Sequence, residues 1–268
     1  MYGIVFCFAR RGPYSQRMRI SQVSMVYLRR LRPGHRPDRG SHDVIFRASP
    51  AAIPFIQNCI FIVYGLRLAG YLLHRELKVG GYGKRVMKDA KTSSDVSFGV
   101  KIAIWITVAF LYAFQTCPVL FRLENGTSGL SSDILGVLGI VISAAGVVIE
   151  SAADVQKSRS KKKRPGRFVD TGLYRIVRCP NYMGELMLWT GVFISGLTVY
   201  NGPGQWISAI AGYAGIVYVM FSGARRLEIR QDRDYGHMEE YVAYKDKTPI
   251  MIPFVPLYSV KKHKWLVA

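Results

Sequence analysis

The run Ile134-Leu-Gly-Val-Leu-Gly-Ile-Val-Ile-Ser-Ala-Ala-Gly-Val-Val-Ile149 contains no charged residue and is rich in glycine. Uncharged apolar runs of this kind predict helices that cross a membrane. Small residues on such a helix let a neighbouring helix approach closely. The run therefore predicts a membrane helix that packs tightly against another.

Four more apolar runs flank this one, at residues 51–74, 99–121, 186–199 and 205–222. Half of the 268 residues are apolar, yet the formal net charge is +20, and the two kinds of residue are segregated along the chain. Segregation into apolar runs and basic connections is typical of multi-pass membrane proteins. The expected fold class is all-α, a polytopic helical membrane protein with about five to seven transmembrane helices.

Lys and Arg are concentrated in residues 75–98, 156–178 and 223–268, and residues 122–133 and 200–205 contain few of them. Alternation through five spans places the three basic segments on one side, the cytosol or its equivalent. We expect a multi-pass protein of the endoplasmic reticulum or an organelle membrane, with the lipid bilayer as a partner. Because the basic residues flank apolar runs, the charge does not indicate binding to nucleic acid.

Residues 1–50 contain ten Arg, no Lys and no acidic residue before Asp38. This composition is typical of an organelle transit peptide, although a disordered basic tail or a misassigned start fits it too. Alternation places this segment opposite the other basic segments. Cleavage, a re-entrant segment or a wrong start would each remove that conflict. The predicted organisation is a basic segment at 1–50, a membrane domain at 51–258 and a basic tail at 259–268.

The four cysteines are scattered along the chain without paired spacing: Cys7, Cys59, Cys117 and Cys179. Disulfide frameworks and zinc sites both show recurrent short spacings. The sequence therefore predicts reduced thiols and no metal site.

Polar residues at helical spacing interrupt the first apolar run, where Tyr64, Arg67 and Tyr71 follow one another at intervals of three and four. Residues at these intervals share one face of a helix. An arginine at membrane depth is costly and marks a functional site by default. This face is a candidate functional site.

A second polar group follows the central run, where Glu150 and Asp154 lie one helical turn apart. A basic loop comes next, with Lys161, Arg164 and Arg167 suited to the phosphates of a cofactor. Such a run can also serve only as an orientation signal or a contact to anionic lipids. The acids suit ribose or amide groups.

The segment Gly172-Leu-Tyr-Arg-Ile-Val-Arg-Cys-Pro-Asn-Tyr-Met-Gly-Glu185 resembles the C-terminal signature of the steroid 5-alpha-reductase family, in its broad branch of uncharacterised bacterial, protist and plant members. The segment from Glu150 to Lys157 resembles the stretch before that signature. Leu227 to Pro253 resembles the family's tail, and Tyr64 to Tyr71 its substrate-side helix. The similarity covers roughly residues 55 to 257.

This resemblance implies a helical membrane fold that holds NADPH at the cytosolic face. It implies hydride transfer to a C=C bond conjugated to a carbonyl, in a lipophilic steroid-, isoprenoid- or lipid-like substrate. Hydride addition builds charge on the carbonyl oxygen, which needs an aimed donor. Tyr64 matches that donor, with Arg67 and Glu185 as further catalytic candidates. The cofactor-binding candidates are Glu150, Asp154, Lys161, Arg164, Arg167, Tyr174, Arg175, Arg178, Asn181, Tyr182, Arg226 and Arg230.

Two departures from the family pattern keep other functions open. Cys179 stands where many relatives have His, and residues 1–50 contain no counterpart of the acid that partners the Tyr in steroid reductases. An S-adenosylmethionine-dependent methyltransferase of the isoprenylcysteine type shares much of the pattern but uses that His. A degenerate, non-catalytic family member is the third alternative.

Overall fold

The computed structural model of the chain describes residues 52–78, 98–126 and 130–266. The targeting segment predicted at residues 1–50 lies outside these ranges, as does most of the basic connection predicted at 75–98. All the described residues belong to one unit, Ala48–Ala268.

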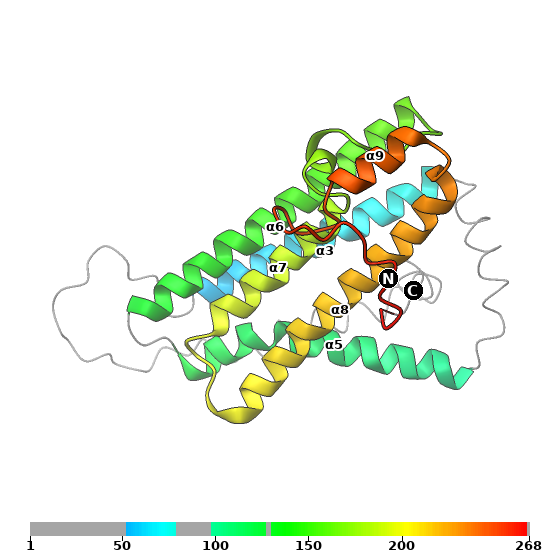
Figure 1. The fold of residues 1–268 in the computed structure, drawn as a ribbon. Coiled ribbons are helices and arrows are strands. Elements are labelled where there is room, and N and C mark those ends of the chain that lie inside the picture. Colours follow the sequence, from blue (N-terminus) through cyan, green and yellow to red (C-terminus); the bar gives the residue numbers. More distant parts are fainter. Residues whose placement is uncertain (1–51, 79–97, 127–129, 267–268) are drawn as a thin grey trace. The chain divides into compact units, whose positions relative to one another are not determined.

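Every regular element in the described ranges is helical (Figure 1), which confirms the predicted all-α class. The elements are α3 (Ala52–Lys78), α5 (Phe98–Asn125), α6 (Leu130–Lys163), the 3-10 helix η1 (Gly172–Arg175), α7 (Pro180–Gly196), α8 (Gly202–Tyr235) and α9 (Glu239–Lys247). Within these ranges, α3, α5, α6 and α8 are long and apolar enough to cross a membrane. The fourth predicted span, at residues 186–199, falls mostly in α7, which has 17 residues, or about 25 Å of helix.

Helix α6 corrects one prediction, because the basic segment expected to be a loop after Asp154 is helical as far as Lys163. Lys, Arg, Gln and Ser tolerate helical geometry well, so loss of apolar character does not end a helix. The helix ends just before Pro165-Gly166, a pair that disfavours further helix. The polar continuation of α8 to Tyr235 follows the same rule.

Small residues join α6 to α7, as the central run predicts. A Cβ atom added to Gly191 would meet the carbonyl oxygen of Gly139 and would lie 2.6 Å from the backbone nitrogen of Ser143. One added to Gly184 would lie 2.6 Å from the carbonyl oxygen of Gly146. Backbones this close leave room only for the hydrogen atom of a glycine, so the packing of α6 against α7 depends on glycine at these positions.

Replacing Gly191 by Ala should therefore destabilise the protein by about 1–3 kcal/mol, because backbone atoms must move to admit the methyl group. Thermal unfolding in detergent, followed by fluorescence, measures the change. Gly65→Ala is the matched control, since nothing lies within 4 Å of a Cβ atom there. Equal melting temperatures for the two variants would contradict the close packing of α6 and α7.

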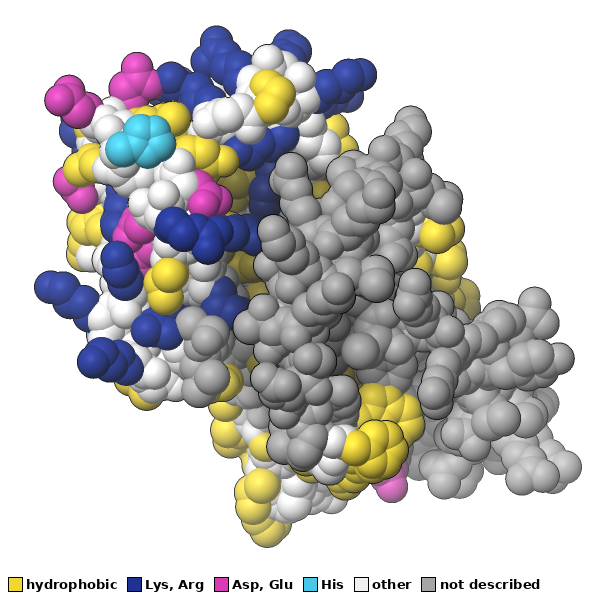
Figure 2. Space-filling model, turned by 90° about the vertical axis from the view of Figure 1, so that its right-hand side faces the viewer, with side chains coloured by type: hydrophobic (Ala, Val, Ile, Leu, Met, Phe, Trp, Pro, Cys, Tyr) yellow, Lys and Arg dark blue, Asp and Glu magenta, His cyan; other side chains and the backbone are white. Residues whose placement is uncertain are grey.

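The long helices alternate in direction, as the charge pattern predicts. Asn125 at the end of α5 donates a hydrogen bond of 2.6 Å to the carbonyl oxygen of Val199, in the connection between α7 and α8. Arg122 likewise donates from Nε to the carbonyl oxygen of Ser195 at 3.0 Å. The C-terminal ends of α6 and α8 lie at the other end, and Figure 2 shows Lys and Arg side chains gathered at one end of the visible face.

The C-terminal segment, in which Pro253 and Pro256 interrupt an apolar run, docks on the helices instead of spanning. The backbone amides of Arg178 and Cys179 donate to the carbonyl oxygens of Pro249 and Ile250, each at 2.9 Å. Ile250 and Met251 are fully buried. The segment thus covers the start of α7 and fixes its N-terminal residues.

Candidate active site

A buried hydrogen bond joins the two catalytic candidates that lie farthest apart in the sequence. The hydroxyl of Tyr64 on α3 donates to Oε1 of Glu185 on α7 at 2.8 Å, and both residues are only 8% exposed. Trp189, one turn along α7, donates from Nε1 to the same oxygen at 3.4 Å. Its ring also meets the ring of Tyr64 edge-on, with centroids 6.5 Å apart. The phenol is therefore held in one position.

Arg67, one turn beyond Tyr64, faces the two acids of α6. Its Nη1 forms an ion pair with Oε2 of Glu150 at 2.8 Å, but the geometry of this contact is not that of a hydrogen bond. Its Nη2 forms an ion pair and a hydrogen bond with Oδ2 of Asp154. Glu185 also lies within the electrostatic field of Glu150. Five of the predicted site residues, on α3, α6 and α7, thus form one polar network, which we call the Tyr64 network.

A cluster of cations lies beside this network at the basic end of the helices. Lys157, the next residue on the Asp154 face of α6, lies in the field of Arg230 on α8. Tyr182 lies in the fields of Arg226 and Arg230, and its ring would be 3.4 Å from a Cβ atom on Gly223, one turn before Arg226. Within the described ranges, Lys157, Arg226 and Arg230 have no ion-pair partner.

Asn181 adds an unsatisfied polar atom at the start of α7. Its side chain is 5% exposed, and Oδ1 accepts no hydrogen bond from any group that the structure describes. A buried acceptor without a donor costs free energy, so such an atom marks a place where a ligand can bind. Tyr182 follows it directly, beside the cations of α8.

Three predicted cofactor contacts are instead held by protein groups. Arg178 forms a buried ion pair with Glu228 at 3.3 Å. Tyr174 donates to the carbonyl oxygen of Ala153 at 3.4 Å. Lys161 donates to the carbonyl oxygen of Arg167 at 2.6 Å and to the hydroxyl of Tyr235 at 2.5 Å. Arg175, another predicted cofactor contact, lies on η1 and is exposed.

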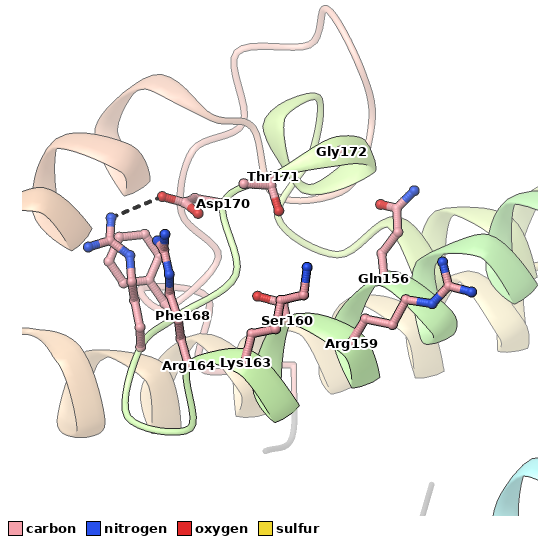
Figure 3. A pocket seen from close by; sticks show the side chains of 10 residues that line it. Gln156, Arg159, Ser160, Lys163, Arg164, Phe168, Asp170, Thr171 and Gly172 are labelled. Atoms are coloured by element: carbon pink, nitrogen blue, oxygen red, sulfur yellow. Dashed lines mark hydrogen bonds and ion pairs between the residues drawn. The ribbon is translucent and has the colours of Figure 1, made fainter.

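The remaining two cofactor candidates line a separate pocket of about 310 Å³ (Figure 3). Its walls are Gln156, Arg159, Ser160, Lys163, Arg164, Arg167, Phe168, Asp170, Thr171 and Gly172. At 100° per residue, Gln156 and Lys163 lie on a different side of α6 from Glu150 and Asp154. The predicted cofactor set is therefore divided between two places, because Arg164 and Arg167 follow the end of α6 and line a pocket on another side of that helix.

A family model described as "Protein of unknown function (DUF1295)" matches residues 47–248. The chain belongs to this family. No curated protein and no solved structure matches it. The matched range contains the whole Tyr64 network and the cation cluster.

Cys179, at the position where many proteins of similar pattern have His, is 1% exposed. Burial raises the pKa of its thiol to about 12. At neutral pH the thiol therefore stays protonated and is a poor nucleophile and a poor base. The backbone amide of Cys179 donates to the carbonyl oxygen of Ile250, and this contact helps to dock the C-terminal segment.

Two members of the site were not among the predicted site residues. Lys157 was signalled only by its place one turn after Asp154 on the same helix face. Trp189 carried no signal, because it lies in an apolar run where a tryptophan is ordinary. Contact with Glu185 is what gives it a role.

Proposed function

We propose that this protein is a membrane-embedded, NADPH-dependent reductase that transfers a hydride to a C=C bond conjugated to a carbonyl in a lipophilic substrate. The observation that supports it best is the buried hydrogen bond from Tyr64 to Glu185. The resemblance of four segments to the steroid 5-alpha-reductase family points the same way. When bound, NADPH supplies the hydride.

The unpaired cations beside the Tyr64 network fit the charge of this cofactor. Lys157, Arg226 and Arg230 would hold its phosphates, since guanidinium and ammonium groups without carboxylate partners suit phosphate oxygens. The orphaned Oδ1 of Asn181 suits an N–H donor such as a carboxamide. Asp154 would accept from a ribose hydroxyl, and Arg67 fixes its position.

Tyr64 would donate to the substrate's carbonyl oxygen as negative charge develops there. A fixed donor in a buried site costs no reorganisation at the moment of reaction, which is why such donors are effective. The hydroxyl donates to Glu185 in the structure, so a substrate carbonyl would compete for that donor. Glu185, in its protonated form, would then donate to the phenol oxygen, orient the phenol and resupply the proton that Tyr64 gives to the substrate. It takes the place of the upstream acid that residues 1–50 lack.

The outer surface of α3 supports a lipophilic substrate. Ile62, Val63 and Leu66 are largely exposed on the same helix that carries Tyr64. In a bilayer such a surface faces lipid. A substrate dissolved in the membrane could therefore reach the helix without crossing water.

Cofactor binding to the detergent-purified full chain tests the proposal against the methyltransferase alternative. We expect NADPH to quench tryptophan fluorescence saturably and S-adenosylmethionine to have no effect. Binding of S-adenosylmethionine without NADPH binding would overturn the reductase proposal. Binding of neither would favour a non-catalytic protein.

Arg230→Gln should raise the Kd for NADPH about tenfold, the effect of losing one charge-assisted hydrogen bond to phosphate. Arg233→Gln is the matched control, because Arg233 lies on the same helix and its side chain is 76% exposed. Equal changes in the two variants would show that only net charge matters. Raising the salt concentration should reduce the difference between Arg230→Gln and the wild type.

A further inference from the structure

The pocket between α6 and residues 167–172 lies outside the Tyr64 network and carries its own excess of charge. Four cationic side chains line it, from Arg159, Lys163, Arg164 and Arg167, against the single carboxylate of Asp170. No ion pair joins Arg159, Lys163 or Arg164 to another described residue. Orientation in a membrane explains basic residues on a surface, but it does not explain why they surround a hollow.

The fourth cation, Arg167, is fixed in the pocket wall by two acidic partners. Arg167 Nη2 lies 3.2 Å from Oδ2 of Asp170, and Nη1 pairs with Glu240 of α9. Its Nε is buried and has no hydrogen-bond partner among the described groups. Figure 3 shows Asp170 and Thr171 across from Ser160 of α6.

The opposite wall is kept close to α6 by specific contacts. The backbone amide of Leu173 donates to Oε1 of Gln156 at 2.9 Å. Gly172 has a φ of +63°, and a Cβ atom there would collide with the same amide group of Gln156. Lys161 fixes the start of this wall through the carbonyl oxygen of Arg167. The pocket is therefore built by the fold and is not a chance gap between long side chains.

The distance of the pocket from the apolar part of α6 indicates which kinds of ligand can reach it. Arg159 lies ten residues beyond Ile149, the last residue of the apolar run, which is about 15 Å of helix. The headgroup layer adds only about 5–7 Å on each side of the apolar core. The pocket therefore opens at the aqueous side of the headgroups, within reach of dissolved phosphate esters and of a projecting headgroup.

We propose that this pocket, lined by Arg159, Lys163, Arg164 and Arg167, binds a phosphomonoester group. A phosphomonoester has three acceptor oxygens and close to two negative charges at neutral pH. Guanidinium groups bind such oxygens in pairs, and Ser160 and Thr171 add hydroxyl donors. This site is separate from the proposed cofactor site and does not depend on the reductase function.

Binding of glycerol 3-phosphate to the full chain in nanodiscs of neutral lipid, measured by calorimetry at constant ionic strength, tests the proposal. Nanodiscs containing phosphatidic acid, compared with phosphatidylglycerol at equal charge, test the lipid source. Arg159→Gln should weaken binding about tenfold. Lys162→Gln should leave binding unchanged, because this substitution removes the same charge from a residue that does not line the pocket. Asp170→Asn should tighten binding, because it removes the only carboxylate.

Saturable binding of glycerol 3-phosphate that depends on Arg159 would support a dissolved ligand. Binding seen only with phosphatidic acid would support a lipid headgroup. Equal losses in Arg159→Gln and Lys162→Gln, or no binding of either probe, would overturn the site. NADPH binding weakened by Arg159→Gln as much as by Arg230→Gln would also overturn it, since the pocket would then belong to the cofactor site.

Discussion

Tyr64→Phe should lower the rate of enone-dependent NADPH oxidation by about 10²- to 10³-fold, the usual cost of removing one donor to a developing oxyanion. The substitution removes only the hydroxyl that Glu185 holds. The ring keeps its contact with Trp189, so the fold should be intact. The rate is measured as loss of NADPH absorbance with a lipophilic enone in detergent micelles.

The control for this variant is Tyr213→Phe, which removes a hydroxyl paired with Thr190 on the other side of α7. NADPH binding should be the same in both variants and in the wild type, because Tyr64 is proposed to contact the substrate and not the cofactor. Equal rates for Tyr64→Phe and the wild type would mean that no catalysis runs through this phenol. Glu185→Gln, which keeps the shape of the acceptor, should lower the rate less than Tyr64→Phe.

Arg178→Gln should reduce the free energy of unfolding by about 3–5 kcal/mol, because it leaves a buried carboxylate without its main cation. The side chains of Arg178 and Glu228 are 1% and 0% exposed. Arg178 also donates to the carbonyl oxygen of Tyr258, and Glu228 accepts from the amide of Val260 at 2.9 Å. Loss of the guanidinium thus loosens α7, α8 and the C-terminal segment together.

Fluorescence-detected thermal unfolding in detergent measures this effect. Arg175→Gln is the matched control, since it makes the same change three residues away on an exposed side chain. We expect its melting temperature to stay within a degree or two of the wild type, as for most surface substitutions. Similar melting temperatures for Arg175→Gln and Arg178→Gln would contradict the buried ion pair. Because Arg178 was predicted as a cofactor contact, NADPH binding by any folded Arg178→Gln protein also tests that role.

Several site residues could be predicted from the sequence because their signals are local. Tyr64 and Arg67 stand out as polar residues at helical spacing in an apolar run. Glu150 and Asp154 stand out one turn apart at the end of another run. What could not be predicted is which acid would partner the phenol. Glu185 follows Tyr64 by 121 residues, and no periodicity links positions on two different helices.

The basic run at residues 157–167 shows that residues close together in the sequence can lie apart in the structure. Lys157, Lys161, Arg164 and Arg167 lie within eleven residues and suggest one anion site. Because α6 continues through Lys163, its helical phase turns Lys157 toward Arg230 and turns Lys163 toward the separate pocket. A loop would have imposed no such division, and this is why the sequence alone suggests one anion site where the structure has two groups of cations.

The sequence by itself determined the helical class, the alternation of the spans and the basic end, because these depend only on how apolar and charged residues are spaced along one chain. Only the tertiary structure decided that Tyr64 meets Glu185, that Arg67 meets Glu150 and Asp154, and that Arg178 supports the fold. Those contacts depend on how each helix is rotated against its neighbours. That rotation is fixed by close approaches such as Gly139 to Gly191, where the shape of two helices matters and the spacing within one does not.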